Sequence, residues 1–233
     1  MHPWWFLDEL AHAGPEHLDA RFVAGYDRKQ GHPDPEPDLE VLRGFGCLTP
    51  ASTVVDLGAG TGRFALSAAA YCGRVVAVDI SRVMVEHLRR SAAEAGATNV
   101  ECVVAGFLSY DHQDAPADAI YSRNALHQLP DFWKGIALRR MAQIVRPRGV
   151  LRLHDLVYDF TPAEAVDVLE RWMGSAATDP NNGNTSEDFA THIRTEFSTY
   201  RYLLEPLLTA AGFEIVDSDV RMRVYATYTC VKR

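Results

Sequence analysis

An acidic residue and a series of glycines follow the first strongly apolar run of the chain. Asp56 lies within the run Val54–Leu57, and glycines stand at positions 58, 60 and 62. Glycine lets the backbone approach a ligand closely, and the N-terminus of a following helix offers free N–H groups. Asp79 ends a second apolar run about twenty residues later, the distance at which a carboxylate meets ribose hydroxyls in a strand–helix–strand unit. The spacing predicts a site for a nucleoside cofactor.

A nicotinamide or flavin dinucleotide site is the obvious alternative, and two features argue against it. The G-x-G-x-x-G pattern of such sites requires a third glycine where Arg63 stands. Asp56, two residues before the first glycine, would repel a pyrophosphate but attract the ammonium group of an amino acid. We therefore expect a cofactor with a cationic amino-acid end.

At these residues the chain resembles the class I S-adenosylmethionine-dependent methyltransferases. The sequence Asp56-Leu57-Gly58-Ala59-Gly60-Thr61-Gly62 matches the first motif of the class, and Val78–Ser81 matches the second. The resemblance covers residues 50–155 and the tail. Within the class, the chain is similar to bacterial small-molecule methyltransferases related to the quinone-biosynthesis enzymes, and its tail at 196–213 is similar to an actinobacterial group. Some relatives of that kind methylate natural products, including indole-containing cyclic dipeptides.

The resemblance implies S-adenosylmethionine as the cofactor and S-adenosylhomocysteine as the product. Gly58 and Gly60 would allow close approach of the cofactor, and Asp56 and Thr61 would surround its amino-acid end. The full set of expected cofactor contacts is Tyr26, Asp56, Gly58, Ala59, Gly60, Thr61, Asp79, Ile80, Gly106, Phe107 and Arg123. For Tyr26 the alternative is packing within an N-terminal cap, and for Arg123 it is a surface ion pair with Asp118 or another acid.

One position departs from the pattern of the class. Relatives often carry an aspartate at the position of Gly106, where it binds the adenine amino group, and here that carboxylate is missing. Gly106 and Phe107 would instead meet the adenine through backbone atoms and an aromatic face, unless Phe107 belongs to the core.

Methyl transfer from a sulfonium requires little covalent help, so catalytic residues are weakly encoded. His127 is the first candidate on the acceptor side, because it follows the predicted fourth strand and can take up a proton near neutral pH. His154, at the end of the predicted fifth strand, is the second candidate. Its neighbour Asp155 must point to the opposite side of an extended chain, so only one of the two can face the acceptor. A packed, hydrogen-bonded structural role is the alternative for all three side chains.

Several aromatic side chains could line an acceptor pocket, and ordinary core packing is the alternative for each. They are Trp4, Trp5, Phe6, Trp133, Phe160, Trp172 and Tyr200. Glu196 and Glu205 could act as polar anchors in such a pocket, with solvation at the surface as the alternative.

Strands and helices alternate along most of the chain, which predicts an α/β fold with a Rossmann-like, seven-stranded, mostly parallel sheet and helices on both faces. We expect a helical N-terminal cap and hinge over 1–45 and a methyltransferase domain over 46–233 with an insertion at about 157–198. Residues 174–188 are polar and predict a mobile loop within that insertion. The segments 213–220 and 223–230 predict a terminal hairpin that adds the antiparallel strand.

Composition narrows the class of partner. The chain has 233 residues and a formal net charge of -8, which disfavours a nucleic-acid partner and favours a small methyl acceptor. The four scattered cysteines suggest neither a disulfide framework nor a metal site. The sequence shows no secretory leader and no apolar run long enough to span a membrane, so we expect a cytoplasmic, bacterial protein. An oligomer is compatible with the sequence. An RNA or protein methyltransferase of the same fold, or a scaffold that binds cofactor without turnover, are the alternatives.

Overall fold

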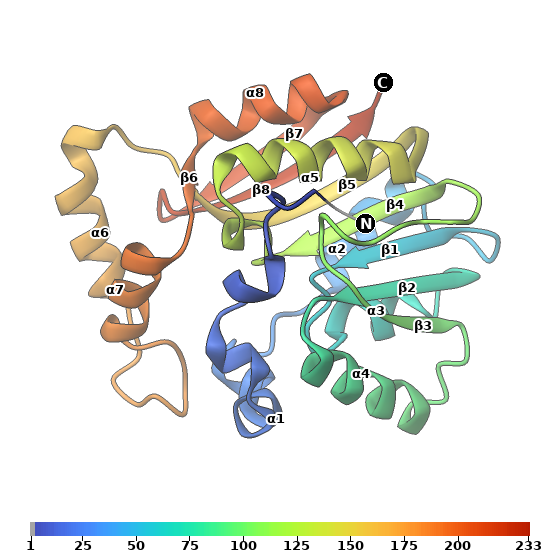
Figure 1. The fold of residues 1–233 in the computed structure, drawn as a ribbon, viewed down its shortest axis with the longest axis horizontal. Helices are drawn as coiled ribbons and strands as arrows, with labels where there is room; N and C mark the ends of the chain where they lie inside the picture. Colours follow the sequence, from blue (N-terminus) through green and yellow to red (C-terminus); the bar gives the residue numbers. More distant parts are fainter. Residues whose placement is uncertain (1–2) are drawn as a thin grey trace.

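The computed structural model describes residues 3–233, apart from the side chain of Glu16, and shows a single twisted sheet with helices on both faces (Figure 1). The strand order is β3-β2-β1-β4-β5-β8-β7, in which β8 is antiparallel to both of its neighbours, and a two-residue strand, β6, pairs with β5. The strands are β1 Thr53–Leu57, β2 Arg74–Asp79, β3 Val100–Val104, β4 Ala117–Arg123, β5 Val145–Tyr158, β6 Thr199–Tyr200, β7 Phe213–Arg221 and β8 Tyr225–Lys232. The predicted α/β, Rossmann-like fold is thus confirmed, with one short strand beyond the seven expected.

The helices form a layer on each side of this sheet. They are α1 Ala20–Lys29, α2 Glu36–Gly44, α3 Arg63–Ala68, α4 Arg82–Glu94, α5 Asp131–Ile144, α6 Ala165–Met173, α7 Ser186–Thr195 and α8 Arg201–Ala211. Short 3-10 turns are η1 Glu9–His12, η2 Pro15–Leu18, η3 Leu126–Gln128 and η4 Pro162–Glu164. Alternate residues of β1 face opposite layers: Val55 packs with α5 and α8, and Val54 packs with α2 and α3. This double burial is why the central strands are continuously apolar.

One local prediction differs from the structure. The polar stretch 174–188 is not entirely loop, because α7 begins at Ser186. A capping box explains the helix start: Thr185 and Asp188 exchange hydrogen bonds with each other's backbone. Within residues 1–45, α2 begins at Glu36 with a proline in its first turn, a position that proline favours.

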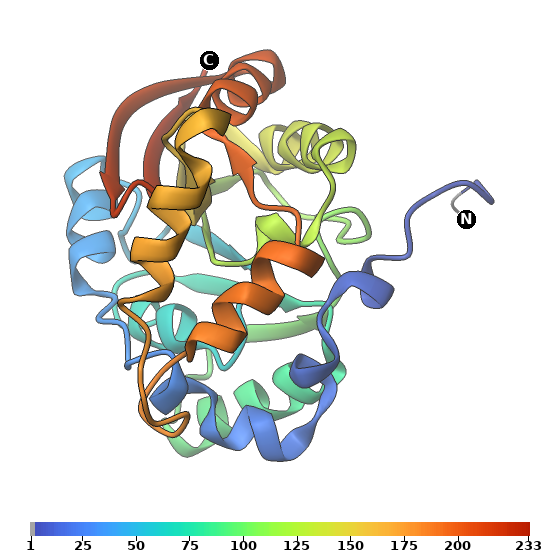
Figure 2. The same ribbon diagram turned by 90° about the vertical axis from the view of Figure 1, so that its left-hand side faces the viewer.

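The N-terminal segment and the insertion after β5 meet at one end of the sheet. Figures 1 and 2 place α1, α6 and α7 beyond the carboxyl ends of the parallel strands. Lys29 of α1 and Asp188 of α7 form an ion pair of 3.1 Å across this region. Within residues 3–233, no helix is long and apolar enough to cross a bilayer.

Candidate active site

The glycine-rich loop after β1 turns sharply beneath a cleft. Gly58 and Ala59 donate their N–H groups to the carbonyl of Val78 on β2, at 2.9 and 3.0 Å, so the loop is fixed to the neighbouring strand. Gly58 has a φ of +77°, and a Cβ there would overlap the side chain of Ala125. Only glycine therefore fits at this position, and the backbone is left open toward the cleft.

Asp79 lies at the end of β2, as predicted, and lines the same cleft. Its Oδ2 accepts from Gly60 N–H and its Oδ1 from Ser81 N–H, both at 2.8 Å. Burial raises the pKa of this carboxyl, and the two backbone donors oppose the shift. These bonds fix the orientation of the carboxylate at the position where a ribose would lie. Ile80, Gly106 and Phe107 line the cleft beside it.

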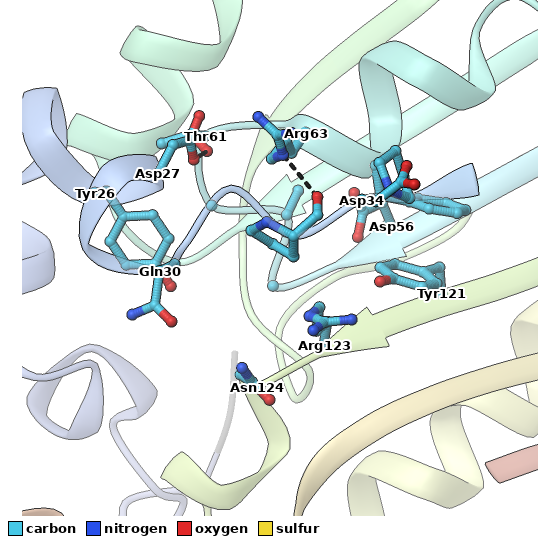
Figure 3. A pocket seen from close by; sticks show the side chains of 16 residues that line it. Tyr26, Asp27, Gln30, Asp34, Asp56, Thr61, Arg63, Tyr121, Arg123 and Asn124 are labelled. Carbon is cyan, nitrogen blue, oxygen red and sulfur yellow. Dashed lines mark hydrogen bonds between the residues drawn. The ribbon is translucent and has the colours of Figure 1, made fainter. Parts of the chain in front are cut away.

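Asp56 is a buried carboxyl without a counter-ion. It is 2% exposed and lines the cleft drawn in Figure 3 together with Gly60, Arg123 and Asn124. Burial, followed by the charge of Asp79, raises its pKa to about 8. Among residues 3–233, no cationic side chain lies within ion-pair distance of Asp56. A ligand ammonium group beside Asp56 would offset the free-energy cost of ionising this buried carboxyl, because an opposite charge favours the ionised form.

Three other residues that were predicted to contact the cofactor, Tyr26, Thr61 and Arg123, also line this cleft. Tyr26, on α1, approaches Gly60 from the cap side of the cleft. Thr61 donates its hydroxyl to Asp27 at 2.5 Å, so it fastens α1 to the loop. The alternative of an Arg123–Asp118 ion pair is wrong, because Asp118 pairs with Arg146 at 2.7 Å.

A larger cavity of about 340 Å³ adjoins the cleft, bounded by α1, the loop after β4, α7 and β8. Tyr26 and Asn124 line both the cleft and this cavity, so the two lie next to each other and share these wall residues. Asn124 has a φ of +49°, a left-handed conformation that asparagine tolerates better than most residues. The cavity is lined by His17, Phe22, Tyr26, Lys29, Gln30, Asn124, His127, Gln128, Leu156, Trp172, Asn184, Glu187, Asp188, Phe189, Thr191, His192, Glu196 and Tyr225.

His127 stands in this cavity between two carboxylates. Its Nδ1 lies 2.5 Å from Asp155 Oδ1, and its Nε2 lies 2.9 Å from Glu196 Oε2. Burial lowers the pKa of His127, but Asp155 and then Glu196 outweigh burial and raise it to about 9. Both ring nitrogens face acceptors, so both carry protons, and His127 is an imidazolium at neutral pH.

Glu196 gathers several donors at one oxygen. Burial raises its pKa, but His127 and His192 outweigh burial and hold the pKa well below its ordinary value. His192 Nδ1 lies 2.7 Å from the same Oε2, and Gln128 donates to it at 2.9 Å. Glu196 therefore lies in the cavity wall with its carboxylate hydrogen-bonded, and its role as a polar anchor for an acceptor stays a prediction. Glu205 instead pairs with Arg201 at 2.8 Å.

The same cluster has the spacing for a metal ion. The ligand atoms of His127, His192 and Glu196 lie within 4.8 Å of one another, the one such group found in the described part of the chain. Each of these atoms already takes part in a hydrogen bond within the cluster. Shared protons thus satisfy the cluster, and a metal would have to displace them.

His154 does not line this cavity, but it lines a neighbouring cavity of about 330 Å³ together with Arg123, Asn124 and Asp155. Its Nε2 lies 2.7 Å from Asp38, and Thr227 lies 2.9 Å from its Nδ1. Burial lowers the pKa of His154 against the opposing effect of Asp38. As the alternation along β5 requires, Asp155 takes the opposite direction and reaches His127. The catalytic role predicted for His154 stays a prediction, and the strand directs its side chain to Asp38 and Thr227.

Only one of the aromatic residues expected at an acceptor pocket lines the cavity, namely Trp172. Trp4 and Trp5 are exposed, Phe6 and Trp133 pack on each other, and Phe160 and Tyr200 belong to a small core near α6. Sequence reasoning missed Phe22, Phe189, Tyr225 and His192, because nothing in local periodicity places α1, α7 and β8 together. The capping box before α7 was the one available signal for part of this wall.

Comparisons with known proteins agree with this geometry. Residues 54–149 match the family model described as "Methyltransferase domain". The chain is 30% identical over 124 residues to 27-O-demethylrifamycin SV methyltransferase of Amycolatopsis mediterranei (strain S699). The aligned region covers 52% of this chain and 45% of that protein. The chain spans less than half the length of the curated relatives it matches.

Two solved structures show how far the fold is shared. A putative sarcosine dimethylglycine methyltransferase from Galdieria sulphuraria aligns with a TM-score of 0.68 and 17% identity, over 90% of this chain and 97% of that chain. Magnesium protoporphyrin IX methyltransferase from Synechocystis PCC 6803, solved with bound S-adenosylmethionine, aligns with 0.66 and 16%, over 99% and 100%. The matched segment is a methyltransferase domain, and the whole chain has the fold of such enzymes.

Proposed function

We propose that this protein is an S-adenosylmethionine-dependent methyltransferase that methylates nitrogen, oxygen or carbon of a small aromatic metabolite. The observation that carries the proposal is that the cleft at Asp79 and a separate, larger cavity share the wall residues Tyr26 and Asn124. A methyl donor in the cleft and an acceptor in the cavity would lie next to each other at these residues. Such placement provides the orientation and water exclusion on which methyl transfer chiefly depends.

The residues of the cleft fit S-adenosylmethionine. Asp56 is a buried carboxyl in need of a cation and would hold the amino group, and Arg123 on the same cleft would hold the carboxylate. Asp79 would hold the ribose hydroxyls, and the open backbone at Gly58 and Gly60 would allow close approach. S-adenosylmethionine, when bound, supplies an electrophilic methyl group on a sulfonium. The chain's own task is to orient the acceptor and handle any proton that the acceptor loses.

The cavity walls suit an acceptor with an aromatic part. Phe22, Phe189 and Tyr225 provide ring faces, and the buried Trp172 stacks on Phe189 at 4.2 Å between centroids. An indole-bearing natural product or a related ring system would pack against such walls.

The polar side of the cavity is provided by His127, Glu196 and His192, and Asp155 holds His127 from outside the cavity wall. As an imidazolium, His127 would donate a hydrogen bond to an acceptor oxygen or nitrogen and position it. His127 could take up a proton from the acceptor only after the imidazolium has lost one of its two ring protons. That loss requires a pH near 9, or movement of Glu196 away from the ring when the acceptor binds.

The broader setting belongs to the same proposal. We place the enzyme in the bacterial cytoplasm, with residues 1–45 as cap and hinge, 46–233 as the methyltransferase domain, and 157–198 as the insertion that walls the cavity. A relationship to quinone-biosynthesis and actinobacterial enzymes is part of it. The cavity volume of about 340 Å³ and the net charge of -8 favour a small acceptor over RNA or a protein.

The first test is calorimetric titration with S-adenosylmethionine and S-adenosylhomocysteine. We expect micromolar binding, which Asp79→Ala abolishes and the matched control Asp217→Ala, an exposed acid on β7, leaves unchanged. Indole, phenol and amine metabolites are then screened for a mass increase of one methyl group. Absence of binding to either ligand would refute the proposal; binding without transfer to any acceptor would favour a cofactor-binding scaffold.

A further inference from the structure

A carboxylate from the N-terminal segment is inserted at the far end of the nucleoside cleft. Glu9, on η1, is 9% exposed and lines the cleft that Asp79 also lines. Its Oε2 accepts from Leu108 N–H at 3.0 Å and from the Ser109 hydroxyl at 3.1 Å. Glu9 is separated from these partners by about a hundred residues of chain, so tertiary structure alone brings it there.

The space for this carboxylate exists because position 106 has no side chain. A Cβ on Gly106 would overlap the Glu9 carboxyl group, whose atoms are its three nearest neighbours. Gly106 is not among the glycines with positive φ, so the backbone conformation does not demand glycine here. A side chain at position 106 would instead displace the Glu9 carboxylate from the place that it now occupies. The missing acid noted in the sequence is thus replaced, in space, by an acid from another segment.

The surroundings of Glu9 define what it can recognise. The cleft that Glu9 and Asp79 both line also has apolar walls, among them Ile80, Met84 and Phe107. With the ribose at Asp79, a base would extend toward the end of β3, because β3 is the strand next to β2 and Gly106, beside Glu9, follows it. Apolar walls together with a carboxylate match a heterocycle with an exocyclic amino donor.

The carboxylate keeps acceptor capacity for such a donor. Burial raises the pKa of Glu9, and the donors at Leu108, Ser109 and Phe107, together with the charge of Arg140, oppose that shift. A carboxylate has about four lone-pair sites, so these three hydrogen bonds do not saturate it.

We propose that Glu9 recognises the cofactor's purine base by accepting a hydrogen bond from its exocyclic amino group, so that adenine binding holds the N-terminal segment closed over the cleft. This inference rests on the proposed function. In place of an acid fixed on the sheet, the protein would use one carried by a segment packed over the site. Base recognition and ordering of residues 3–18 are then coupled. The base needs the Glu9 carboxylate in the cleft, and the bound base in turn holds the segment that carries Glu9.

The decisive test compares S-adenosylhomocysteine with S-inosylhomocysteine, which has a 6-oxo acceptor in place of the 6-amino donor. We expect the wild type to prefer the 6-amino ligand by about 10- to 100-fold in Kd, the range for a hydrogen bond to a charged group. Glu9→Ala should lose that preference by weakening only the 6-amino ligand. Glu9→Gln, which can donate to a 6-oxo group, should reduce or reverse it. The control Glu94→Ala, an exposed acid at the end of α4, should leave both values unchanged.

A second set of variants moves the carboxylate back to the sheet. Gly106→Asp should weaken S-adenosylhomocysteine in the presence of Glu9, because the two acids would overlap, yet strengthen it in the Glu9→Ala background. This reversal of sign cannot arise from general loss of fold, and thermal unfolding of each variant checks that all are folded. Retention of the 6-amino preference in folded Glu9→Ala would overturn the inference.

Amide hydrogen exchange reads the coupling separately. S-adenosylhomocysteine should protect backbone amides in residues 3–18 of the wild type, and it should protect them markedly less in Glu9→Ala at ligand saturation. Equal protection in both would contradict the coupling. Failure of the wild type to bind either nucleoside would instead refute the proposed function itself, so the two failures are distinguishable.

Discussion

Substitution of His127 by glutamine tests the charge state on which our account of the acceptor cavity depends. The pKa of His127 is raised from its ordinary 6.5 to about 9 by Asp155 and Glu196. At 1.36 kcal/mol for each pKa unit, this corresponds to about 3 kcal/mol of folding free energy held by the protonated ring. The ring is almost fully buried, so solvent screening does not reduce this value substantially.

The sign of the pH dependence follows from the two states. Below pH 6.5 the ring is protonated in both folded and unfolded protein, and the stabilisation is fully present. Between 6.5 and about 9 only the folded protein keeps the proton, so the free energy of unfolding falls as pH rises. Above about 9 this contribution is lost.

The assay is urea unfolding of wild type and His127→Gln at intervals from pH 6 to 9.5. Asp56, with a pKa near 8, also titrates in this window, so the quantity to follow is the difference between the two proteins. That difference should shrink by about 3 kcal/mol across the window. His87→Gln, on α4 and outside this network, serves as the matched control. A difference that stays constant with pH would refute the assignment of His127 as an imidazolium.

Three further results are expected. Asp56→Asn should stabilise the unliganded protein at pH 8 to 9, because it removes a desolvated charge, and chemical unfolding measures this effect. The same variant should bind S-adenosylmethionine more than tenfold more weakly by calorimetry, and an unchanged Kd would contradict the role of Asp56. Gly62→Ala should destabilise the fold by about 1–3 kcal/mol, since its Cβ would lie 2.5 Å from Leu88 Cγ at a φ of +87°, and a thermal midpoint equal to that of wild type would argue against this. Treatment with a chelator should leave methyl transfer unchanged, because protons already satisfy the cluster of His127, His192 and Glu196, and activity restored only by added metal would show the opposite.

The position of the predicted cofactor residues along a cleft after β1 and β2 could be predicted from sequence, because these residues are close together in the chain. Asp56, the glycines and Asp79 belong to one strand–helix–strand unit, whose internal geometry is set by local backbone rules. The fold class followed from the same alternation of strands and helices, with helix ends the least accurate part. A local pattern also predicted that the side chains of His154 and Asp155 diverge, though not which of them would contact His127.

The acceptor half was decided by tertiary structure. His127, Asp155 and Glu196 come from η3, β5 and the end of α7, and no spacing rule connects them. The aromatic wall was largely mispredicted for the same reason: its rings come from α1, α7 and β8, which meet only when the insertion packs against the cap.

Position 106 shows the division most clearly. The sequence by itself determined that the usual acid is missing after β3, and it could say nothing about what fills the space. Only the packing of the N-terminal segment brings Glu9 to Gly106, because a contact across about a hundred residues depends on how elements dock and not on local conformational preference. Short-range spacing thus determined the fold and the nucleoside site of this protein, and long-range packing determined its acceptor cavity and the carboxylate at the end of the cleft.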